Sequence, residues 1–133
     1  MFKRKPPLRT EPLTLHSGSV VKTEDGYFFI TKSKIGVTTR RRIPTYRVLQ
    51  SWNFARIIEC AESAVAHYPI LGKLGFRDGT LIRTLFENRL YIIADRKRHP
   101  VTSPEALADH GLTIDDAILV SEEEADLHKE VES

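Results

Sequence analysis

The sequence lacks the residues and runs that several protein classes require. Cysteine occurs once in 133 residues, so the chain can form neither an internal disulfide nor a cysteine-rich zinc site. Its apolar runs, such as YFFI and AILV, have the length of a strand, whereas a membrane helix needs roughly 18 residues. No phosphate-binding glycine loop or nucleophile elbow is present. The fold must therefore depend on the packing of its core.

The first residues, MFKRKPPLRTEPL, are basic but run into prolines where a secretory signal would have an apolar core. We therefore expect no export signal and synthesis in the cytoplasm. The prolines and basic residues of this segment also disfavour a regular helix or a packed core over residues 1–16. This segment is predicted to be an extended arm, which either orders on a neighbouring subunit or frays.

Charge is distributed unevenly along the chain although the net charge is only +2. Residues 1–66 contain 12 Lys and Arg against 5 Asp and Glu, and residues 67–133 contain 8 against 13. One interpretation is a basic face for phosphates or an acidic partner. The other is a basic tail and loop at one end with an acidic helix at the other.

Two stretches of the sequence are similar, SGSVVKT at 17–23 and DGTLIRT at 78–84. Each is followed by a turn and by an aromatic and β-branched run, YFFITK or LYIIAD, which predicts a β-hairpin. A basic patch and a short helix follow in both copies. Thr45 and Ser103 are N-cap residue types, and Asn53 and Gly111 suit the left-handed residue after a helix.

The last blocks, RIIECAESAVAHYP at 56–69 and AILVSEEEADLHKE at 117–130, predict a second helix in each copy. Ser121 and Glu124 form a capping-box pattern in the second. A step of 61 residues pairs His67 with His128 and Cys60 with Ser121. The four steps along the chain, 61, 63, 58 and 61, change only in predicted loops, which indicates a tandem duplication.

The predicted fold is α+β, with two similar units that each contain a β-hairpin or meander followed by two short helices. The predicted domains are an arm at 1–16, a first repeat at 17–75 and a second repeat at 76–133. Each unit alone would be marginally stable at this size, so the two are expected to pack together. The predicted core residues are Val20, Val21, Phe28, Ile30, Leu49, Phe54, Ile57 and Ile58, with Leu81, Ile82, Tyr91, Ile93, Leu107, Leu112, Ile118 and Val120 as their counterparts.

The second copy resembles a repeat of roughly sixty residues found in bacterial surface-associated proteins and in structural proteins of tailed phages. The matching positions cover about 76–131 and comprise Asp78 to Arg83, Tyr91, Arg98, Ser103 to Glu105, Leu107, Gly111-Leu112, Val120, Ser121 and Glu124. The first copy matches more weakly and lacks Ser-Pro-Glu, and Asp95-Arg96 stands where the family has Asn-Gly or Asp-Gly. The resemblance implies a noncatalytic module, often strung in series.

The residue pattern favours no catalytic, metal or cofactor site. The five histidines show no metal-ligand spacing, and the carboxylate clusters do not alternate as in a calcium loop. Cys60 lies in an apolar stripe and is predicted to be a buried thiol. We therefore expect no enzyme activity and no cofactor.

The leading functional hypothesis is a noncatalytic structural or assembly protein, most consistent with a tail, connector or head-associated part of a tailed-phage virion. Its partners would be other virion or surface-assembly proteins, or further copies of itself, and no membrane. The predicted partner-binding residues are Lys3, Arg4, Lys5, Arg9, Lys32, Lys34, Arg40, Arg41 and Arg42. The alternatives are a small nucleic-acid-binding protein that uses the basic half, and a cell-wall or carbohydrate-binding module that uses Tyr46 and Trp52. The expected location is the virion, and otherwise the cytoplasm or the cell surface.

Overall fold

A computed structural model describes residues 7–132. The chain divides into two compact units. Unit 1 comprises the chain up to Pro44 together with Phe54–Leu74, and unit 2 comprises Thr45–Asn53 together with the chain from Gly75 onward. The segment Thr45–Asn53 therefore belongs to unit 2 although it follows the first three strands of the sequence.

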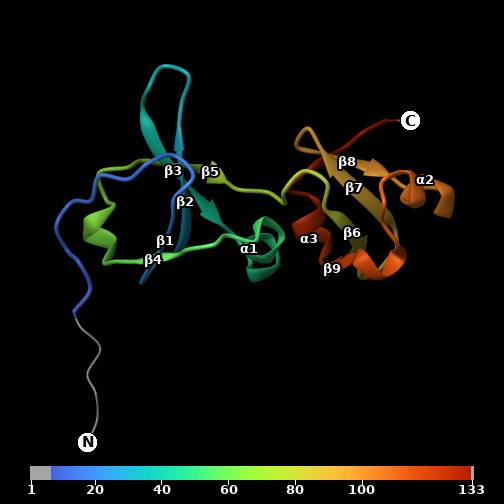
Figure 1. The fold of residues 1–133 in the computed structure, drawn as a ribbon, viewed down its shortest axis with the longest axis horizontal. Coiled ribbons are helices and arrows are strands. Elements are labelled where there is room, and N and C mark those ends of the chain that lie inside the picture. The colour runs from blue at the N-terminus through green and yellow to red at the C-terminus, as the bar shows by residue number, and fades with distance from the viewer. Residues whose placement is uncertain (1–6, 133) are drawn as a thin grey trace, which may run out of the picture. The chain divides into compact units, whose positions relative to one another are not determined.

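Unit 1 is a five-stranded mixed sheet (Figure 1). Strands β1 (Val20–Thr23), β2 (Gly26–Lys32) and β3 (Thr38–Ile43) form an antiparallel meander. Strand β4 (Ile58–Glu59) pairs parallel with β1, and β5 (Ile70–Lys73) pairs parallel with β3. The strand order is β4-β1-β2-β3-β5, and a short 3-10 helix η1 (Glu62–Ala64) lies between β4 and β5.

Unit 2 contains a sheet with the same topology. Its meander is β6 (Leu81–Thr84), β7 (Leu90–Ala94) and β8 (Lys97–Pro100), with β9 (Ile118–Val120) parallel to β6 and β10 (Lys129–Glu130) parallel to β8. Its order, β9-β6-β7-β8-β10, repeats unit 1 strand for strand. The helices α1 (Tyr46–Trp52), α2 (Pro104–Asp109) and α3 (Glu122–Ala125) and the 3-10 helix η2 (Ile114–Asp116) complete the unit.

The strand registers fix which residues are equivalent in the two sheets. Val20 lies opposite Phe29 as Leu81 lies opposite Ile92, which confirms the steps of 61 and 63 residues. Ile30 lies opposite Arg40 as Ile93 lies opposite Arg98, which confirms the step of 58.

The predicted step of 61 in the last block is wrong by one residue. Val21 pairs with Ile58 as Ile82 pairs with Ile118, so the step there is 60. The burial pattern of residues 61–68 keeps this step against 121–128. The true counterpart of His128 is therefore Tyr68, and that of Cys60 is Val120.

The predicted α+β class, with a hairpin or meander and two helices per unit, is wrong. Each unit is dominated by its five-stranded sheet, and the second helix predicted for the first copy is replaced by β4, η1 and β5. Ile57 and Ile58 are β-branched, and such residues fit a strand better than a helix. Pairing with β1 also satisfies backbone groups that a short helix would leave open at its ends.

The helix ends follow the prediction more closely. Thr45 and Ser103 are the N-caps of α1 and α2, and their hydroxyl groups accept hydrogen bonds from the N–H groups of Val48 and Ala106. Asn53 is the C-cap of α1, and Gly111 follows the C-cap His110 of α2; both residues have left-handed backbone, with φ of 50° and 69°. The predicted capping box between Ser121 and Glu124 is also present at the start of α3.

Apolar residues on one face of the unit 1 sheet form a cluster that Leu13 and Leu15 of the arm pack against. In unit 2, a cluster of Leu81, Ile92 and Leu107 lies between the sheet and α2. Most predicted core residues are buried or half-buried, but Ile57 is 38% exposed. The unit 1 cluster consists of Val21, Phe28, Ile30, Cys60, Ala64, Val65 and Tyr68.

Candidate interaction surfaces

The contacts of α1 within unit 2 centre on Glu124, which is only 4% exposed. The Thr45 hydroxyl donates to one carboxylate oxygen at 2.7 Å, and the Arg47 guanidinium donates to the other at 2.7 Å. The backbone N–H of Ser121 also donates to this carboxylate at 3.0 Å. A buried carboxylate with three donors thus joins the start of α1 to the start of α3.

These donors determine the ionisation of Glu124. Burial by itself raises the pKa of a carboxyl group. Hydrogen bonds from the Ser121 backbone, Thr45 and Arg47 outweigh this effect, so the pKa of Glu124 is lowered below its ordinary value. The charged form is therefore the one that holds α1 in place.

The end of α1 is held by two further hydrogen bonds in unit 2. The indole N–H of Trp52 donates to the Gly75 carbonyl at 2.8 Å, and the N–H of Arg77 donates to the Ser51 hydroxyl at 3.2 Å. Val48, between these polar anchors, is fully buried. On this face of α1, Val48, Ser51 and Trp52 pack within unit 2, whereas Arg47 is exposed and is held through its ion pair with Glu124.

Next to this surface, the side chain of His128 contacts the backbone before β6 and the turn between β7 and β8. Its Nε2 accepts from the N–H of Phe76 at 2.9 Å, and its Nδ1 lies 2.8 Å from the carbonyl oxygen of Arg96. A ring that accepts at Nε2 carries its proton at Nδ1, which then donates to that carbonyl. Burial lowers the pKa of His128 and favours this neutral form.

Unit 1 uses a tyrosine at the equivalent position. The hydroxyl of Tyr68 accepts from the N–H of Leu15 at 2.9 Å, as His128 accepts from Phe76. The carbonyls of Tyr68 and His128 in turn accept hydrogen bonds from Arg40 and Arg98. A buried polar side chain therefore fixes the same backbone position in both units.

The structure separates the predicted partner-binding residues into different environments. Lys3, Arg4 and Lys5 lie outside the described residues. The Arg9 side chain is exposed, and its backbone carbonyl accepts from the N–H of Ala61, so this part of the arm lies on unit 1. Lys32 and Lys34 are exposed at the tip of the β2–β3 hairpin, beside Ile35.

The three consecutive arginines of β3 are not equally accessible. Arg40 is 5% exposed, forms an ion pair with Glu62 and lies over the ring of Phe28. Arg42 also lies over the Phe28 ring, and its guanidinium donates to the Asp25 carbonyl, whereas Arg41 is half-buried. Of the three, Arg40 is a structural residue of unit 1, and Arg98 repeats its position over Tyr91.

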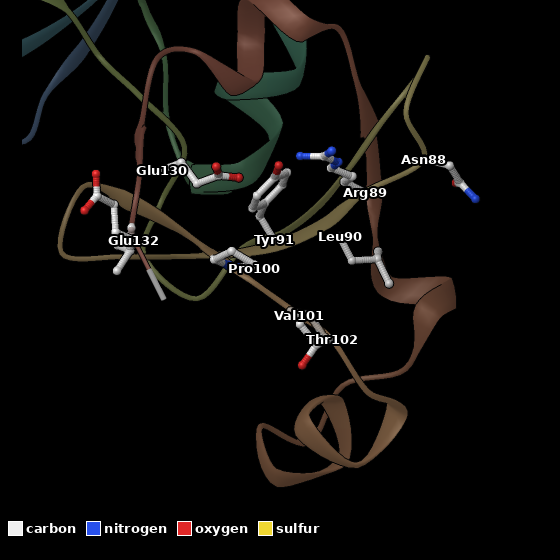
Figure 2. Close-up of a pocket in the computed structure, with 10 residues that line it drawn as sticks. Asn88, Arg89, Leu90, Tyr91, Pro100, Val101, Thr102, Glu130 and Glu132 are labelled. Carbon is white, nitrogen blue, oxygen red and sulfur yellow. The ribbon is translucent and has the colours of Figure 1, made fainter.

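A groove of about 770 Å³ lies along β7, β8 and β10 of unit 2 (Figure 2). The hydroxyl of Tyr91 points between Arg89 and Glu130, and burial together with its hydrogen bond to Glu130 raises the pKa of this tyrosine. In unit 1 the guanidinium of Arg42 lies beside the equivalent ring, where unit 2 has Pro100. Proline is shorter than arginine and uncharged, so this side of the Tyr91 ring borders the groove.

A second cavity of about 490 Å³ lies beneath α2, and its walls are mainly apolar. Leu90 and Val101 contribute from the sheet, and Leu107 and Leu112 from the helix and the loop that follows. This cavity is a hydrophobic recess between α2 and the sheet.

The remaining reactive residues have structural surroundings. Cys60 is fully buried, and burial raises its thiol pKa, which disfavours the reactive thiolate. Over residues 7–132 no three or more His, Cys, Asp or Glu side chains gather as a metal site would require. Within the same range, no helix has the length and apolar character needed to cross a membrane.

Comparison with family models, curated proteins and solved structures finds no match to this chain.

Sequence reasoning missed Glu124 as the centre of the α1 contacts. It identified this residue as a member of a capping box and as a position of the family repeat, but not as a contact of α1. Its two side-chain partners lie 77 and 79 residues earlier in the sequence, and a glutamate is seldom buried. The sequence did show that Thr45 and Glu124 both lie at predicted helix starts, but nothing in it indicated that these two helix starts are in contact.

Proposed function

We propose that this chain is a noncatalytic structural or assembly protein, and that it is a component of a tailed-phage virion. The observation that carries this proposal is the repeated sheet together with α1, a helix from the first copy of the sequence that is built into the second unit. Each repeat then supplies a sheet and a helix suited to contact a neighbouring repeat. The resemblance of residues 76–131 to a repeat of tailed-phage structural proteins supports the virion as the location.

The arm and the repeat surfaces supply the contacts in this proposal. The N–H of Leu13 donates to the carbonyl of Ala64 and the Leu13 side chain packs on the unit 1 cluster, so this part of the arm lies on unit 1 of its own chain. The exposed Arg9 beside it is the arm residue we propose to contact a neighbouring subunit. The groove beside Tyr91 and the recess beneath α2 are further surfaces for neighbouring subunits.

The proposal is tested on purified particles. An epitope-tagged copy of the chain, produced during phage growth, should sediment with tailed particles, and immunogold labelling should place it at a fixed part of each particle. A tagged protein of similar size that has no role in the virion is the control. Absence of the chain from the particles, together with a purified protein that binds no virion component, would overturn the proposal.

The nucleic-acid alternative gives a different result in a binding titration. It predicts DNA or RNA binding that weakens steeply as salt rises. Lys32→Ala with Lys34→Ala is the informative variant because both side chains are exposed, whereas Arg40 is buried. Binding that this variant removes would favour the alternative over the assembly role.

A further inference from the structure

The helices α1 and α2 occupy the same position in the two copies of the sequence. The first-copy helix α1 belongs to unit 2, which is built mainly from the second copy, whereas α2 belongs to the unit of its own copy. At the step of 58 residues, Arg47, Val48, Ser51 and Trp52 of α1 correspond to Glu105, Ala106, Asp109 and His110 of α2. In α1, Val48 is buried, Ser51 and Trp52 are half-buried, and the exposed Arg47 is ion-paired with Glu124. In α2, Glu105, Asp109 and His110 are exposed and Ala106 is half-buried.

The surface of unit 2 that receives α1 has a counterpart on unit 1. The Gly75 carbonyl and the Arg77 N–H, which bind Trp52 and Ser51, correspond to Thr14 and His16 at the step of 61 residues. The residue between them is held alike in both units, by Tyr68 in unit 1 and by His128 in unit 2. Thr14 and His16 are exposed.

The exposed face of α2 and the corresponding surface of unit 1 also have complementary charges, but here the helix is acidic and the surface is basic. In unit 2 the basic Arg47 of the helix meets the acidic Glu124. On the free face of α2 the helix supplies the acids, Glu105 and Asp109. Unit 1 has Ala64 at the position of Glu124, and the charged residue it supplies is the basic Arg9, whose backbone carbonyl accepts from the N–H of Ala61.

The same complementarity holds for the whole units. Unit 1 contains 12 Lys and Arg against 5 Asp and Glu, and unit 2 contains 8 against 13. An α2 helix from another copy therefore matches unit 1 and mismatches unit 2, where Glu105 would face the carboxylate of Glu124.

We propose that α2 of one copy docks on unit 1 of a second copy, in the way that α1 packs within unit 2. Glu105, Ala106, Asp109 and His110 form one side of this contact, and Arg9, Thr14 and His16 form the other. The contact is head-to-tail, so it generates a ring if the rotation closes and an open chain if it does not. This inference rests on the proposed assembly function and names a second copy of the chain as the partner.

The test measures self-association of the full-length purified chain by sedimentation velocity over a range of protein concentrations. The wild-type protein should form species larger than a dimer. Two variants should remain monomeric: an α2 variant with Glu105→Arg and Asp109→Arg, and a unit 1 variant with Arg9→Glu and His16→Glu. Each lowers the association constant by about tenfold or more, the effect of removing a binding contact worth about 1.4 kcal/mol.

Mixing the two variants distinguishes this contact from others. The α2 variant keeps an intact unit 1, and the unit 1 variant keeps an intact α2, so the mixture should form dimers that grow no further. A variant with Asp115→Arg and Glu123→Arg makes the same change in net charge as the α2 variant, at exposed positions outside α2 and outside the groove beside Tyr91, and it should associate like wild type. Circular dichroism checks that each variant is folded.

The inference is overturned if the wild-type protein is monomeric throughout, if the α2 variant associates like wild type, if the Asp115 and Glu123 control also dissociates, or if the mixture forms no dimer. A chain that is monomeric in solution but present in purified particles overturns this inference alone. Absence from particles overturns the proposed function while leaving any measured self-association in place.

Discussion

At the scale of single residues, the close approach of Gly75 to His128 explains why one glycine is needed in unit 2. A Cβ atom at Gly75 would lie 2.5 Å from Cε1 and 2.6 Å from Nε2 of His128. This ring nitrogen accepts the hydrogen bond from Phe76, so the ring cannot move away without losing that contact. The backbone of Gly75 also accepts the Trp52 indole, which places the glycine between two anchors.

Replacing this glycine should therefore destabilise unit 2. Gly75→Ala is expected to lower the free energy of unfolding by about 1–3 kcal/mol, the usual cost of overpacking a filled site. Urea unfolding followed by far-UV circular dichroism measures the change. Gly79→Ala is not a suitable control because its φ is 90°, whereas Ser19→Ala changes an ordinary half-buried position and should cost much less. Equal costs for the two variants would contradict the steric explanation.

Glu124 provides a test of charge at the same scale. Its pKa is lowered in the folded chain, so the folded state binds the proton less readily than the unfolded state. The stabilisation is fully present above the ordinary pKa of glutamate, and it is lost as the pH falls through the lowered folded value. Stability should thus decline on the acidic side of this window and not on the alkaline side.

Glu124→Ala should cost about 2–3 kcal/mol at neutral pH, because it leaves the Thr45 hydroxyl, the Ser121 N–H and the Arg47 guanidinium without their acceptor. Urea titrations at a series of pH values measure both the cost and its disappearance in acid. The neighbouring Glu123 is exposed, and Glu123→Ala should change stability by no more than about 0.5 kcal/mol. A constant difference between wild type and Glu124→Ala down to the lowest pH would refute the ionic contribution.

At the scale of elements, α1 and α2 begin with the same kind of N-cap but differ in what that cap contacts. The Thr45 hydroxyl both accepts from Val48 and donates to Glu124. The Ser103 hydroxyl accepts from Ala106 at 3.4 Å, a long hydrogen bond. The first cap therefore joins two helices, whereas the second stabilises its own helix.

This difference predicts unequal costs for two matched substitutions. Ser103→Ala should lower the free energy of unfolding by about 0.5–1 kcal/mol, the ordinary value of an N-cap. Thr45→Ala should cost about 2 kcal/mol, because a buried carboxylate also loses a donor. Denaturant unfolding of both variants checks the order, and an equal or reversed order would show that the bond to Glu124 contributes little.

The elements also show which features sequence reasoning can predict. The caps at Thr45 and Ser103 and the left-handed residues Asn53 and Gly111 were predictable because a cap depends on local chemistry. The apolar residues around Ile57 were misassigned to a helix because their spacing suits a buried strand as well. Only the pairing of β4 with β1, which depends on residues far apart in sequence, decides between the two.

At the scale of the whole molecule, the duplication was predictable but its alignment was not complete. Three of the four steps agree with the strand registers, since apolar strand residues constrain them. In the last block, pairing identical residues placed His67 opposite His128. In the structure the counterpart of His128 is Tyr68. Both side chains are buried, and each accepts a hydrogen bond from the equivalent backbone N–H in its own unit. Chemical identity was a poorer guide than burial.

The assignment of α1 to unit 2 also lay beyond the sequence. The helix follows β3 along the chain, and no local feature of residues 45–53 indicates which sheet it accompanies. Its assignment depends on Glu124 and Gly75, which come much later in the sequence. A repeat predicts what each unit contains more readily than it predicts how consecutive units share their elements.

Salt should control self-association of the whole molecule if oppositely charged units meet. The Debye length falls from about 10 Å at 0.1 M salt to about 3 Å at 1 M, so exposed charges then attract one another weakly. The association constant of the wild-type chain should therefore fall as salt rises, whereas that of an interface held by apolar burial alone would stay constant or rise.

Glu105→Gln with Asp109→Asn removes the acids of α2 without adding bulk, and it should flatten this dependence on salt. Asp115→Asn with Glu123→Gln removes the same charge elsewhere in unit 2. This control should leave the dependence of the association constant on salt close to that of wild type. If both pairs flattened the slope equally, the attraction would come from the net charge of unit 2 and not from the face of α2.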